Sequence, residues 1–463
     1  MTARSRTTER DSHRRRHAAR HGCAPPARAR TPRIARPRAA LAGSLAVALL
    51  PLLLGCGADA PVGGAPAVVV RDSAGIRIIE NAAALWRPGA AWRVAPEPSL
   101  EILPMGSNDG AVLLDPASVY RARDGRWIVA DGRFAGWHKV FVFDSLGRFL
   151  AEYGREGQGP CEFRQLWWAR PYRGDSIAAH DYSADKISIF DADGRCGREV
   201  RLPTWVPPRA PGTWGYADGA WTVYDDGAFL TYPGGYLDIE DGPGIAWYRH
   251  ALLRVAPDGE SWDSLGVFGI LQARWTGREQ RELPYAAIAV HAVRANDLLY
   301  GTGERFELLR YDPHGRLVEI VRRPWEPRPV TDAHRERFRA WYRARAVAAS
   351  RTHGGAAGVE RAMRRLDALD YPDHLPAYDR LVVDALGHAW LRHHPGTLTP
   401  DATDPATTPW SIFTPDGRWL GELSLPTPFT PDDIGADYVA GIWEDADAVR
   451  WIRVYALTRA PTT

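Results

Sequence analysis

A short pattern of apolar and polar positions recurs along the chain. An apolar strand end is followed by a turn with Asp or Pro, then by Gly, often by Arg, and by a second strand. Five segments carry the pattern: Phe141–Leu150, Ile187–Cys196, Leu252–Ser261, Leu308–Leu317 and Ser411–Leu420. Asp or Pro initiates the turn, and Gly takes the positive φ that closes a hairpin of about three to five residues. The pattern therefore predicts a series of β-hairpins.

A second element precedes most of these hairpins, namely a short strand that ends in a polar group. Its copies are Arg126–Asp131, Ser176–Asp181, Trp221–Asp226, Asp297–Thr302 and Ala389–His394. We expect each copy to be the second strand of a four-stranded sheet. The five predicted sheets cover residues 115–154, 162–204, 213–270, 286–324 and 376–424.

The chain ends supply a sixth sheet. Residues 434–458 hold about two strands, and Val68–Asn81 and Ser99–Pro104 are strands without local partners. Joining the two ends completes the sheet and closes a ring, which removes exposed edges that invite aggregation. We therefore predict an all-β fold, a six-bladed β-propeller over residues 68–463.

One segment, residues 331–370, departs from the β pattern. Apolar residues at helical spacing predict one helix with Thr331 as N-cap and a second, shorter helix. The apolar faces are Phe338, Trp341, Tyr342, Ala346 and Ala349, then Val359, Met363, Leu366 and Leu369. We interpret this segment as a helical insertion between blades 4 and 5 that packs on the propeller. The alternative is a lid or a docking element over the channel.

These residues resemble a known family. Asp144–Phe163 resembles the signature of NHL-type six-bladed β-propellers, and the opening Asp72–Asn81 resembles bacterial propeller lipoproteins. The resemblance covers about residues 67–459 and departs from the family at Cys161, where Gly is usual. It implies a scaffold with a central channel that is often used for binding and only sometimes for catalysis.

The N-terminal segment reads as an export signal. Ala39–Leu54 is mostly apolar but shorter than the roughly 20 residues of a membrane-spanning helix. The following Gly55-Cys56 resembles the lipobox of bacterial lipoproteins. We expect residues 1–55 to be a signal peptide, Cys56 the lipid attachment site and residues 56–67 a flexible tether. The protein would then be exported and anchored to the bacterial cell envelope, at the outer membrane or periplasmic face. Alternatives are a plain signal anchor and, from Arg14–Arg16, twin-arginine export.

The charge balance excludes a nucleic-acid partner. Twelve of the 58 basic residues but only two of the 56 acidic residues lie in residues 1–39, so 46 basic and 54 acidic residues remain in the body. An acidic body repels a phosphate backbone.

The exported domain keeps two cysteines, Cys161 and Cys196. An oxidising compartment could pair them. Strand order argues against a bond, because it places them at opposite ends of strands that span about 17 Å, whereas a disulfide needs Cα atoms within about 7 Å.

Candidate chemistry lies at the polar ends of the predicted second strands. These residues are Asp131, His180, Asp181, Asp225 and His393. We expect them to gather at one end of the channel, where carboxylates could bind Ca²⁺ and imidazoles Zn²⁺. The alternative is that the Asp side chains accept hydrogen bonds from the N–H groups of adjacent loops.

The sequence predicts a class of function but no specific activity. We expect a monomeric binding scaffold for a protein, peptide or glycan, without an assigned catalytic residue or cofactor. The competing hypothesis is a metal-dependent hydrolase or lyase resembling lactonase-type propellers, and a third is a structural envelope protein. Aromatic faces suit sugar rings, but Trp127, Trp221, Trp390 and Trp451 recur at one strand position, which favours core packing.

Overall fold

The computed structural model describes residues 67–459 except 88, 104–111, 204–218, 233–242, 279, 351–354, 398–405 and 446. The predicted signal peptide, Cys56 and all of the tether except Ala67 lie outside the described residues. Within the described part, neither helix is long and apolar enough to cross a membrane.

Strands dominate the chain, and the predicted all-β class is confirmed. The first sheet consists of β4 (Pro116–Arg121), β5 (Trp127–Asp131), β6 (Lys139–Phe143) and β7 (Phe149–Tyr153). The second consists of β10 (Leu166–Pro171), β11 (Ile177–Asp181), β12 (Lys186–Phe190) and β13 (Cys196–Arg201). The third consists of β14 (Gly219–Val223), β15 (Phe229–Tyr232), β16 (Gly244–Val255), β17 (Trp262–Trp275) and β18 (Gln280–Arg281). Neighbouring strands within each of these sheets are antiparallel.

Three further sheets complete the set. The fourth sheet consists of β19 (Val290–Arg294), β20 (Asp297–Gly301), β21 (Glu307–Tyr311) and β22 (Leu317–Arg322) with β2 (Ile76–Asn81) and β1 (Val68–Ser73). The fifth consists of β23 (Tyr378–Val383), β24 (Ala389–His393), β25 (Thr407–Phe413) and β26 (Trp419–Pro426). The sixth consists of β27 (Phe429–Ile434), β28 (Tyr438–Glu444), β29 (Arg450–Thr458) and β3 (Arg93–Ile102). A small parallel pair, β8 (Arg155–Glu156) and β9 (Glu162–Phe163), lies between the first and second sheets in the chain.

The predicted Asp and Gly turns connect outer strands of these sheets. At the β6–β7 turn, Asp144 accepts hydrogen bonds from the backbone N–H groups of Leu146 and Arg148, both at 2.9 Å. Gly147 closes this turn with a φ of 79°. Asp312 and Gly315 repeat the arrangement at the β21–β22 turn.

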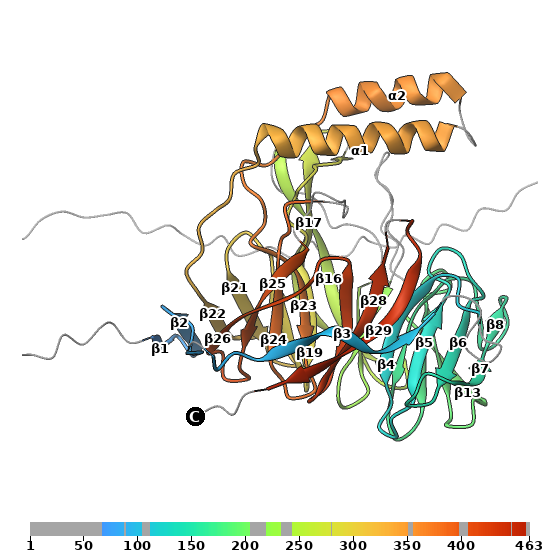
Figure 1. The fold of residues 1–463 in the computed structure, drawn as a ribbon. Helices are drawn as coiled ribbons and strands as arrows, with labels where there is room; N and C mark the ends of the chain where they lie inside the picture. Colours follow the sequence, from blue (N-terminus) through green and yellow to red (C-terminus); the bar gives the residue numbers. More distant parts are fainter. Residues whose placement is uncertain are drawn as a thin grey trace, which may run out of the picture. The chain divides into compact units, whose positions relative to one another are not determined.

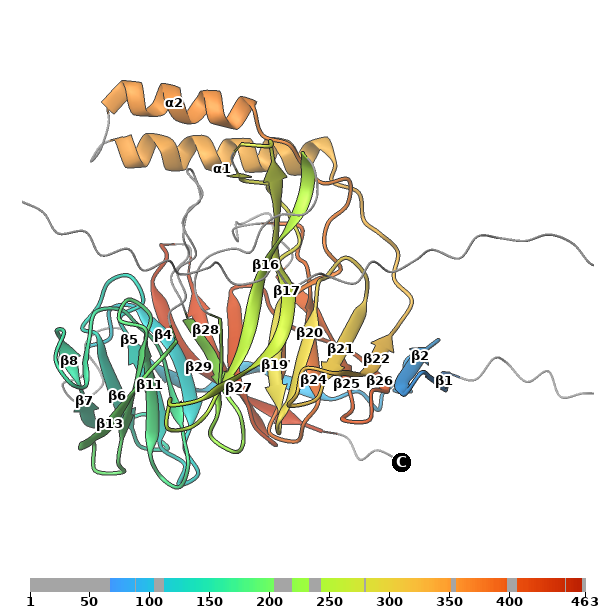
Figure 2. The same ribbon diagram turned by 180° about the vertical axis from the view of Figure 1, so that it is seen from behind.

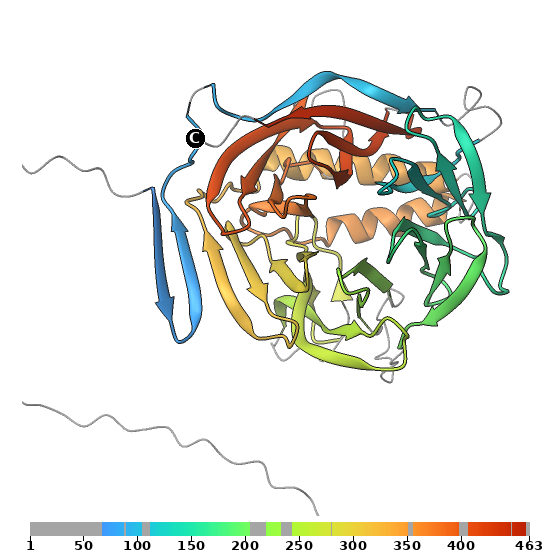
Figure 3. The ribbon, with the colours of Figure 1, turned by 90° about the horizontal axis from the view of Figure 1, so that it is seen from below.

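Six buried apolar clusters each join two successive sheets. One cluster joins the first and second sheets, the next joins the second and third, and so on until the last joins the sixth sheet to the first. The sheets therefore pack in a cyclic order around one axis, which Figure 3 shows from below. In each sheet, the strand named first above lies nearest the axis. These strands are β4, β10, β14, β19, β23 and β27.

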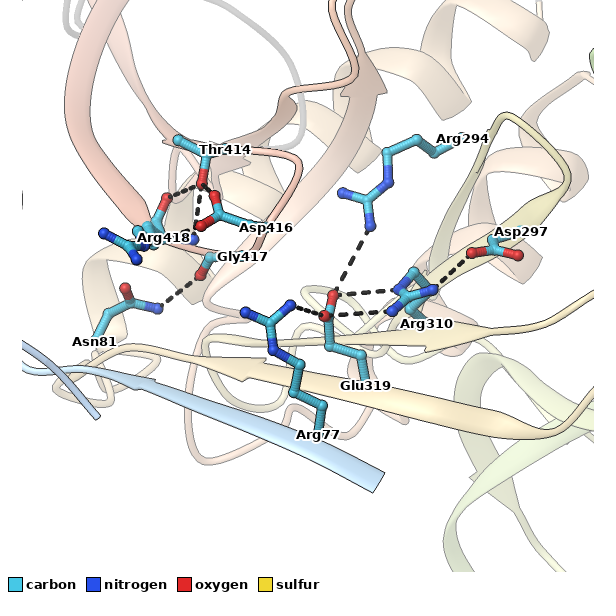
Figure 4. A network of polar contacts seen from close by, with 10 residues as sticks. All are labelled: Arg77, Asn81, Arg294, Asp297, Arg310, Glu319, Thr414, Asp416, Gly417 and Arg418. Carbon is cyan, nitrogen blue, oxygen red and sulfur yellow. Dashed lines mark hydrogen bonds and ion pairs between the residues drawn. The ribbon is translucent and has the colours of Figure 1, made fainter. Parts of the chain in front are cut away.

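The N-terminal strands are divided between two sheets. β3 pairs with β29, as predicted for Ser99–Pro104, with Leu100 opposite Val454. The prediction for Val68–Asn81 was wrong, because β2 instead pairs in parallel with β22. The reason is a set of specific anchors that no local pattern shows: Arg77 bonds the buried Glu319 of β22, and Asn81 bonds the backbone of Gly417 (Figure 4).

The insertion forms the two expected helices, α1 (Asp332–Ser350) and α2 (Gly355–Asp367). Phe338 and Leu366 pack in a buried cluster with Tyr285, whose hydroxyl donates to the carbonyl of His334 at 2.8 Å. The helices stand over the sheet ends that the long strands β16 and β17 reach (Figures 1 and 2) and run across the axis in Figure 3.

The structure contains the disulfide that strand order disfavoured. Cys161 and Cys196 are bonded, with Cα atoms 6.0 Å apart. The expectation failed because the segment after β7 does not cross directly to β10 but runs along β13. There the Cys161 N–H donates to Glu199 at 2.7 Å, and Lys186 Nζ donates to the Gly159 carbonyl at 2.9 Å. This path brings Cys161 beside the start of β13.

Candidate functional site

A central cavity of about 540 Å³ lies on the axis of the six sheets. The first strand of every sheet contributes to its wall: Tyr120 of β4, Arg170 of β10, Thr222 of β14, His291 of β19, Arg380 of β23 and Asp432 of β27. Asp225, Ala295, Ala385 and Gly387 come from the turns between first and second strands. The cavity therefore reaches the end opposite α1 and α2, which connect the end of β22 to the start of β23.

Three charged side chains of the wall are held by other protein groups. Arg294 lies 3.8 Å from the buried Glu319 (Figure 4). Asp384 accepts from Arg459 at 2.8 Å and from the Trp390 indole at 3.0 Å. Asp433 accepts at 2.8 Å from the Tyr438 hydroxyl and from a backbone N–H. Arg294 and Asp384 are therefore compensated by ion pairs, whereas the donors to Asp433 are neutral groups.

Arg170 is held by neutral groups. Its guanidinium donates to the hydroxyls of Thr222 and Tyr120 and lies 4.3 Å from the centre of the Tyr120 ring. Its Nε is buried without a hydrogen-bond partner in the described part of the chain. No carboxylate among the described residues forms an ion pair with it. The positive charge is therefore fixed in place by hydrogen bonds, and it opposes the rise that burial causes in the pKa of the nearby Asp432 and Asp433.

Arg380 and Asp432 face each other across the same section of the cavity. Arg380 donates to the Pro431 carbonyl at 3.3 Å, and its Nη1 is 4.0 Å from Asp432 Oδ1. Asp432 also accepts from the Val119 N–H at 3.2 Å. Burial raises the pKa of Asp432 to about 6, although the charges of Arg380 and Arg170 oppose this shift. Burial also lowers the pKa of Arg380, because its positive charge is desolvated.

Replacing Asp432 by Asn is expected to stabilise the protein by up to about 3 kcal/mol at about pH 8, with little effect near pH 3. The folded pKa of about 6 lies above the ordinary value of 3.8, so the native state binds more protons between these values. Stability contributed by the protonated form is therefore lost as pH rises through this window. Denaturant unfolding across the pH range measures the difference; an equal effect at every pH would contradict this explanation.

Two of the three predicted Asp residues accept hydrogen bonds from the N–H groups of adjacent loops. Asp131 accepts from the N–H groups of Leu114 at 2.9 Å and Asp115 at 2.7 Å, and from Trp137 at 3.1 Å. Asp181 likewise accepts from the N–H of Arg164 at 2.8 Å and from three more backbone N–H groups. Both carboxylates therefore accept hydrogen bonds from loop N–H groups, which was the alternative to a ligand site in the sequence analysis.

Of the two predicted histidines, His180 is buried and His393 is half-buried, and both are neutral. His180 lies 5.4 Å from the Trp168 ring, and burial lowers its pKa to about 3. Burial, aided by Arg323 and Arg328, also lowers the pKa of His393 to about 3. His393 Nε2 is 3.0 Å from Arg323 Nη2 and lines a second cavity of about 540 Å³. That cavity is formed by ends of β22, β24 and β25, away from the central one.

The expected gathering of all five residues is not what the structure shows. Asp225 lines the central cavity, whereas the other four, Asp131, His180, Asp181 and His393, stand at the opposite sheet ends. The reason is that the segment around Trp221–Asp226 forms the first strand of its sheet, β14, and not the second. No group of three or more His, Cys, Asp or Glu side chains among the described residues is placed to hold a metal ion.

Sequence reasoning missed Arg170, Arg380 and Asp432. A signal was present for Arg170 and Arg380, which are charged residues beside apolar ones inside the first strands LWWARP and YDRLVV, but not for Asp432, which lies between Pro431 and Asp433 in FTPDDI. A charged side chain on an otherwise buried strand marks either a paired ion or a polar cavity. The sequence-based candidates were polar residues at strand ends, so charged residues inside strands were not among them.

Comparison with known proteins gives matches in three-dimensional structure but none in sequence. No known family and no curated protein matches the sequence. Among solved structures, a protein assigned as exported from Bacteroides fragilis is 12% identical, with a TM-score of 0.44 over 83% of this chain and 100% of its own. A DUF4221-family member from Bacteroides vulgatus is 10% identical, with a TM-score of 0.48 over 80% and 99%. Virginiamycin B lyase from Staphylococcus aureus is 9% identical, with a TM-score of 0.37 over 80% and 99%. These values assign neither activity nor ligand to this chain.

Proposed function

We propose that the protein is an exported, lipid-anchored six-bladed β-propeller of the NHL type that acts as a monomer and binds a glycan in its central cavity. The observation that carries the proposal is the wall of the cavity. All six first strands line it, and they place fixed donors, Arg170 and Arg380, beside an acceptor, Asp432. The six sheets are the blades, and pairing of β3 with β29 supports ring closure.

The chemistry of the wall favours a glycan over a peptide or a protein. Sugar hydroxyls both donate and accept hydrogen bonds, so they match guanidinium donors and a carboxylate acceptor in one site. The Tyr120 ring adds an aromatic surface, although it is already covered in part by Arg170. The apolar lining consists mostly of Ala and Val, such as Ala292 and Val383, which offer no deep pocket for large apolar side chains.

Export and anchoring have separate support. The Cys161–Cys196 disulfide fits an oxidising compartment outside the cytoplasm, where such bonds persist. The apolar segment Ala39–Leu54 precedes Cys56 as in lipoprotein signals. A Cys56→Ser chain is expected to lose incorporation of a labelled fatty acid and to leave the membrane fraction. Equal labelling of both chains would overturn the anchor.

The binding proposal is tested by screening the full chain, purified in detergent, against arrays of glycans and of peptides. Ala385→Trp blocks the cavity mouth at an exposed turn, and Leu386→Trp is the matched control at the next position, 50% exposed and outside the cavity wall. We expect glycan binding that Ala385→Trp abolishes and Leu386→Trp leaves unchanged. Binding to peptides alone, or equal binding by both variants, would overturn the proposal.

A hydrolase or lyase is the second candidate, and Asp432 is the observation that favours it. A carboxyl group with a pKa of about 6 can exchange a proton near neutral pH, as a general acid or base does. This candidate requires that the bound glycan be cleaved by the wild-type chain. Asp432→Asn would then abolish cleavage while binding remains.

A further inference from the structure

The charged groups in the central section of the cavity are balanced in number. Arg294 and Asp384 already belong to ion pairs with other protein groups, as described above. Asp225 is exposed at the mouth, beyond this section. The charged side chains that remain inside the first strands are Arg170, Arg380, Asp432 and Asp433. Two guanidiniums therefore face two carboxyl groups.

The two carboxylates each keep one oxygen atom available. Asp432 accepts from the Val119 N–H through Oδ2. Asp433 accepts through its own Oδ2 from the Arg121 N–H and from the Tyr438 hydroxyl. Within the described part of the chain, neither Oδ1 atom accepts a hydrogen bond, and both residues line the cavity. Each carboxylate therefore offers an acceptor to a ligand.

The two guanidiniums keep donors beside these acceptors. Arg170 donates to the hydroxyls of Tyr120 and Thr222, and Arg380 donates to one backbone carbonyl. Arg380 Nη1 is 4.0 Å from Asp432 Oδ1, which is too far for a hydrogen bond. A guanidinium has more N–H donors than these bonds use, so each arginine retains some for a ligand. The site therefore presents donors and acceptors together, which suits hydroxyl groups because each hydroxyl both donates and accepts.

The balance of charge disfavours a ligand that adds a net charge. Burial raises the pKa of Asp432 and Asp433, and the positive charge of Arg170 opposes both shifts. The carboxylates and guanidiniums thus stabilise one another where burial already disfavours charge. A ligand carboxylate would be repelled by the two carboxylates, and a ligand ammonium by the two guanidiniums, without a counter-charge that is not already balanced. An uncharged sugar keeps the balance and loses only the hydration of its hydroxyls.

We propose that the central cavity binds glycans without net charge, because its two carboxylates repel acidic sugars and its two guanidiniums repel sugars with free amino groups. This inference rests on the proposed function and narrows it to neutral sugars. The sugar hydroxyls donate to the open Oδ1 atoms of Asp432 and Asp433 and accept from the guanidiniums. A cavity of about 540 Å³ has room for more than one sugar ring.

The test is isothermal titration calorimetry of the full chain in a detergent without a sugar headgroup. The probes are galactotriose and cellotriose, each in three forms that carry a hydroxymethyl, a carboxylate or an aminomethyl group at carbon 6 of every ring. A serine tripeptide serves as the peptide probe. We expect the neutral form of at least one trisaccharide to bind at least about tenfold more tightly than both of its charged forms.

Two substitutions should change this preference in different ways. Asp432→Asn removes one negative charge and should reduce the preference for the neutral over the acidic form at least about fivefold. Arg380→Gln removes one positive charge and should reduce the preference for the neutral over the amino form by a similar factor. A purely structural role would weaken the binding of all three forms equally.

The controls are Asp193→Asn and Arg316→Gln, which remove exposed charges at outer turns and should leave both preferences unchanged. Circular dichroism and melting temperature show whether each variant is folded, and Asp433→Asn and Arg170→Gln supply a second variant of each sign. Charged forms that bind as tightly as the neutral form, or preferences that the cavity variants do not change, overturn this inference but leave the proposed function standing. Binding of the peptide alone, or of none of the probes, overturns both.

Discussion

Glu319→Gln is expected to lower the free energy of unfolding by about 3 kcal/mol or more. The Glu319 side chain is 2% exposed and lies 3.2 Å from Arg77 and Arg310 and 3.8 Å from Arg294 (Figure 4). Gln keeps the size of the side chain but removes the negative charge, so three guanidiniums are left to repel one another around a buried amide. The loss is large because little water reaches this carboxylate to replace the ion pairs.

Glu152→Gln is the matched control. Glu152 is 46% exposed and pairs with Lys139, so its replacement should cost less than about 1 kcal/mol. Denaturant unfolding of both variants measures the difference. The same experiment reports on the N-terminal hairpin, because Arg77 belongs to β2 and should become more accessible to limited proteolysis in Glu319→Gln. A Glu319→Gln chain as stable as Glu152→Gln would show that the network contributes little.

Removal of the disulfide by Cys161→Ser with Cys196→Ser is expected to lower the free energy of unfolding by about 3 to 4 kcal/mol. The bond closes a loop between residues 35 positions apart, which restricts the unfolded chain. It also holds the β7–β9 segment against β13. Denaturant unfolding of this double variant and of the wild-type chain gives the loss directly.

A second double variant separates the bond from the backbone at the same position. Cys161 has a φ of 52°, in the left-handed region that favours glycine. Cys161→Gly with Cys196→Ser should therefore be about 0.5–1 kcal/mol more stable than the pair with Ser at position 161. Two double variants of equal stability would contradict the strain argument, and a wild-type chain no more stable than either would contradict the first prediction.

The hairpins were predictable because their cause is local. Asp144 and Gly147 lie within one turn, and the hydrogen bonds and the positive φ that close the turn depend on these residues themselves. The same holds for the amphipathic faces of α1 and α2, where Phe338 and Leu366 occupy the expected buried positions. The sequence therefore predicted the succession of sheets and the place of the helices.

The errors concern contacts between distant residues. The pairing of β2 with β22 depends on Arg77 and Glu319, which are 242 positions apart. The disulfide depends on the path of the segment after β7, which Lys186 and Glu199 direct from the next sheet. Neither contact has a signature in the residues around it, so hydrophobic periodicity cannot reveal it.

The candidate site was missed for a related reason. Asp131 and Asp181 stand at strand ends, where local patterns draw attention, yet their carboxylates are taken up by backbone N–H groups. Arg170, Arg380 and Asp432 lie on three different sheets, and only the cyclic packing brings them to one cavity. A charged residue in a buried strand was the available sign, and its partners became visible only in three dimensions.

The most direct measurement of the central claim is a crystal structure of the full chain with the glycan that binds most tightly. The account predicts that the sugar lies on the axis of the six sheets, with its hydroxyls within hydrogen-bond distance of Arg170, Arg380 and Asp432. A sugar bound in the second cavity beside His393, or on the outer surface of a sheet, would contradict it.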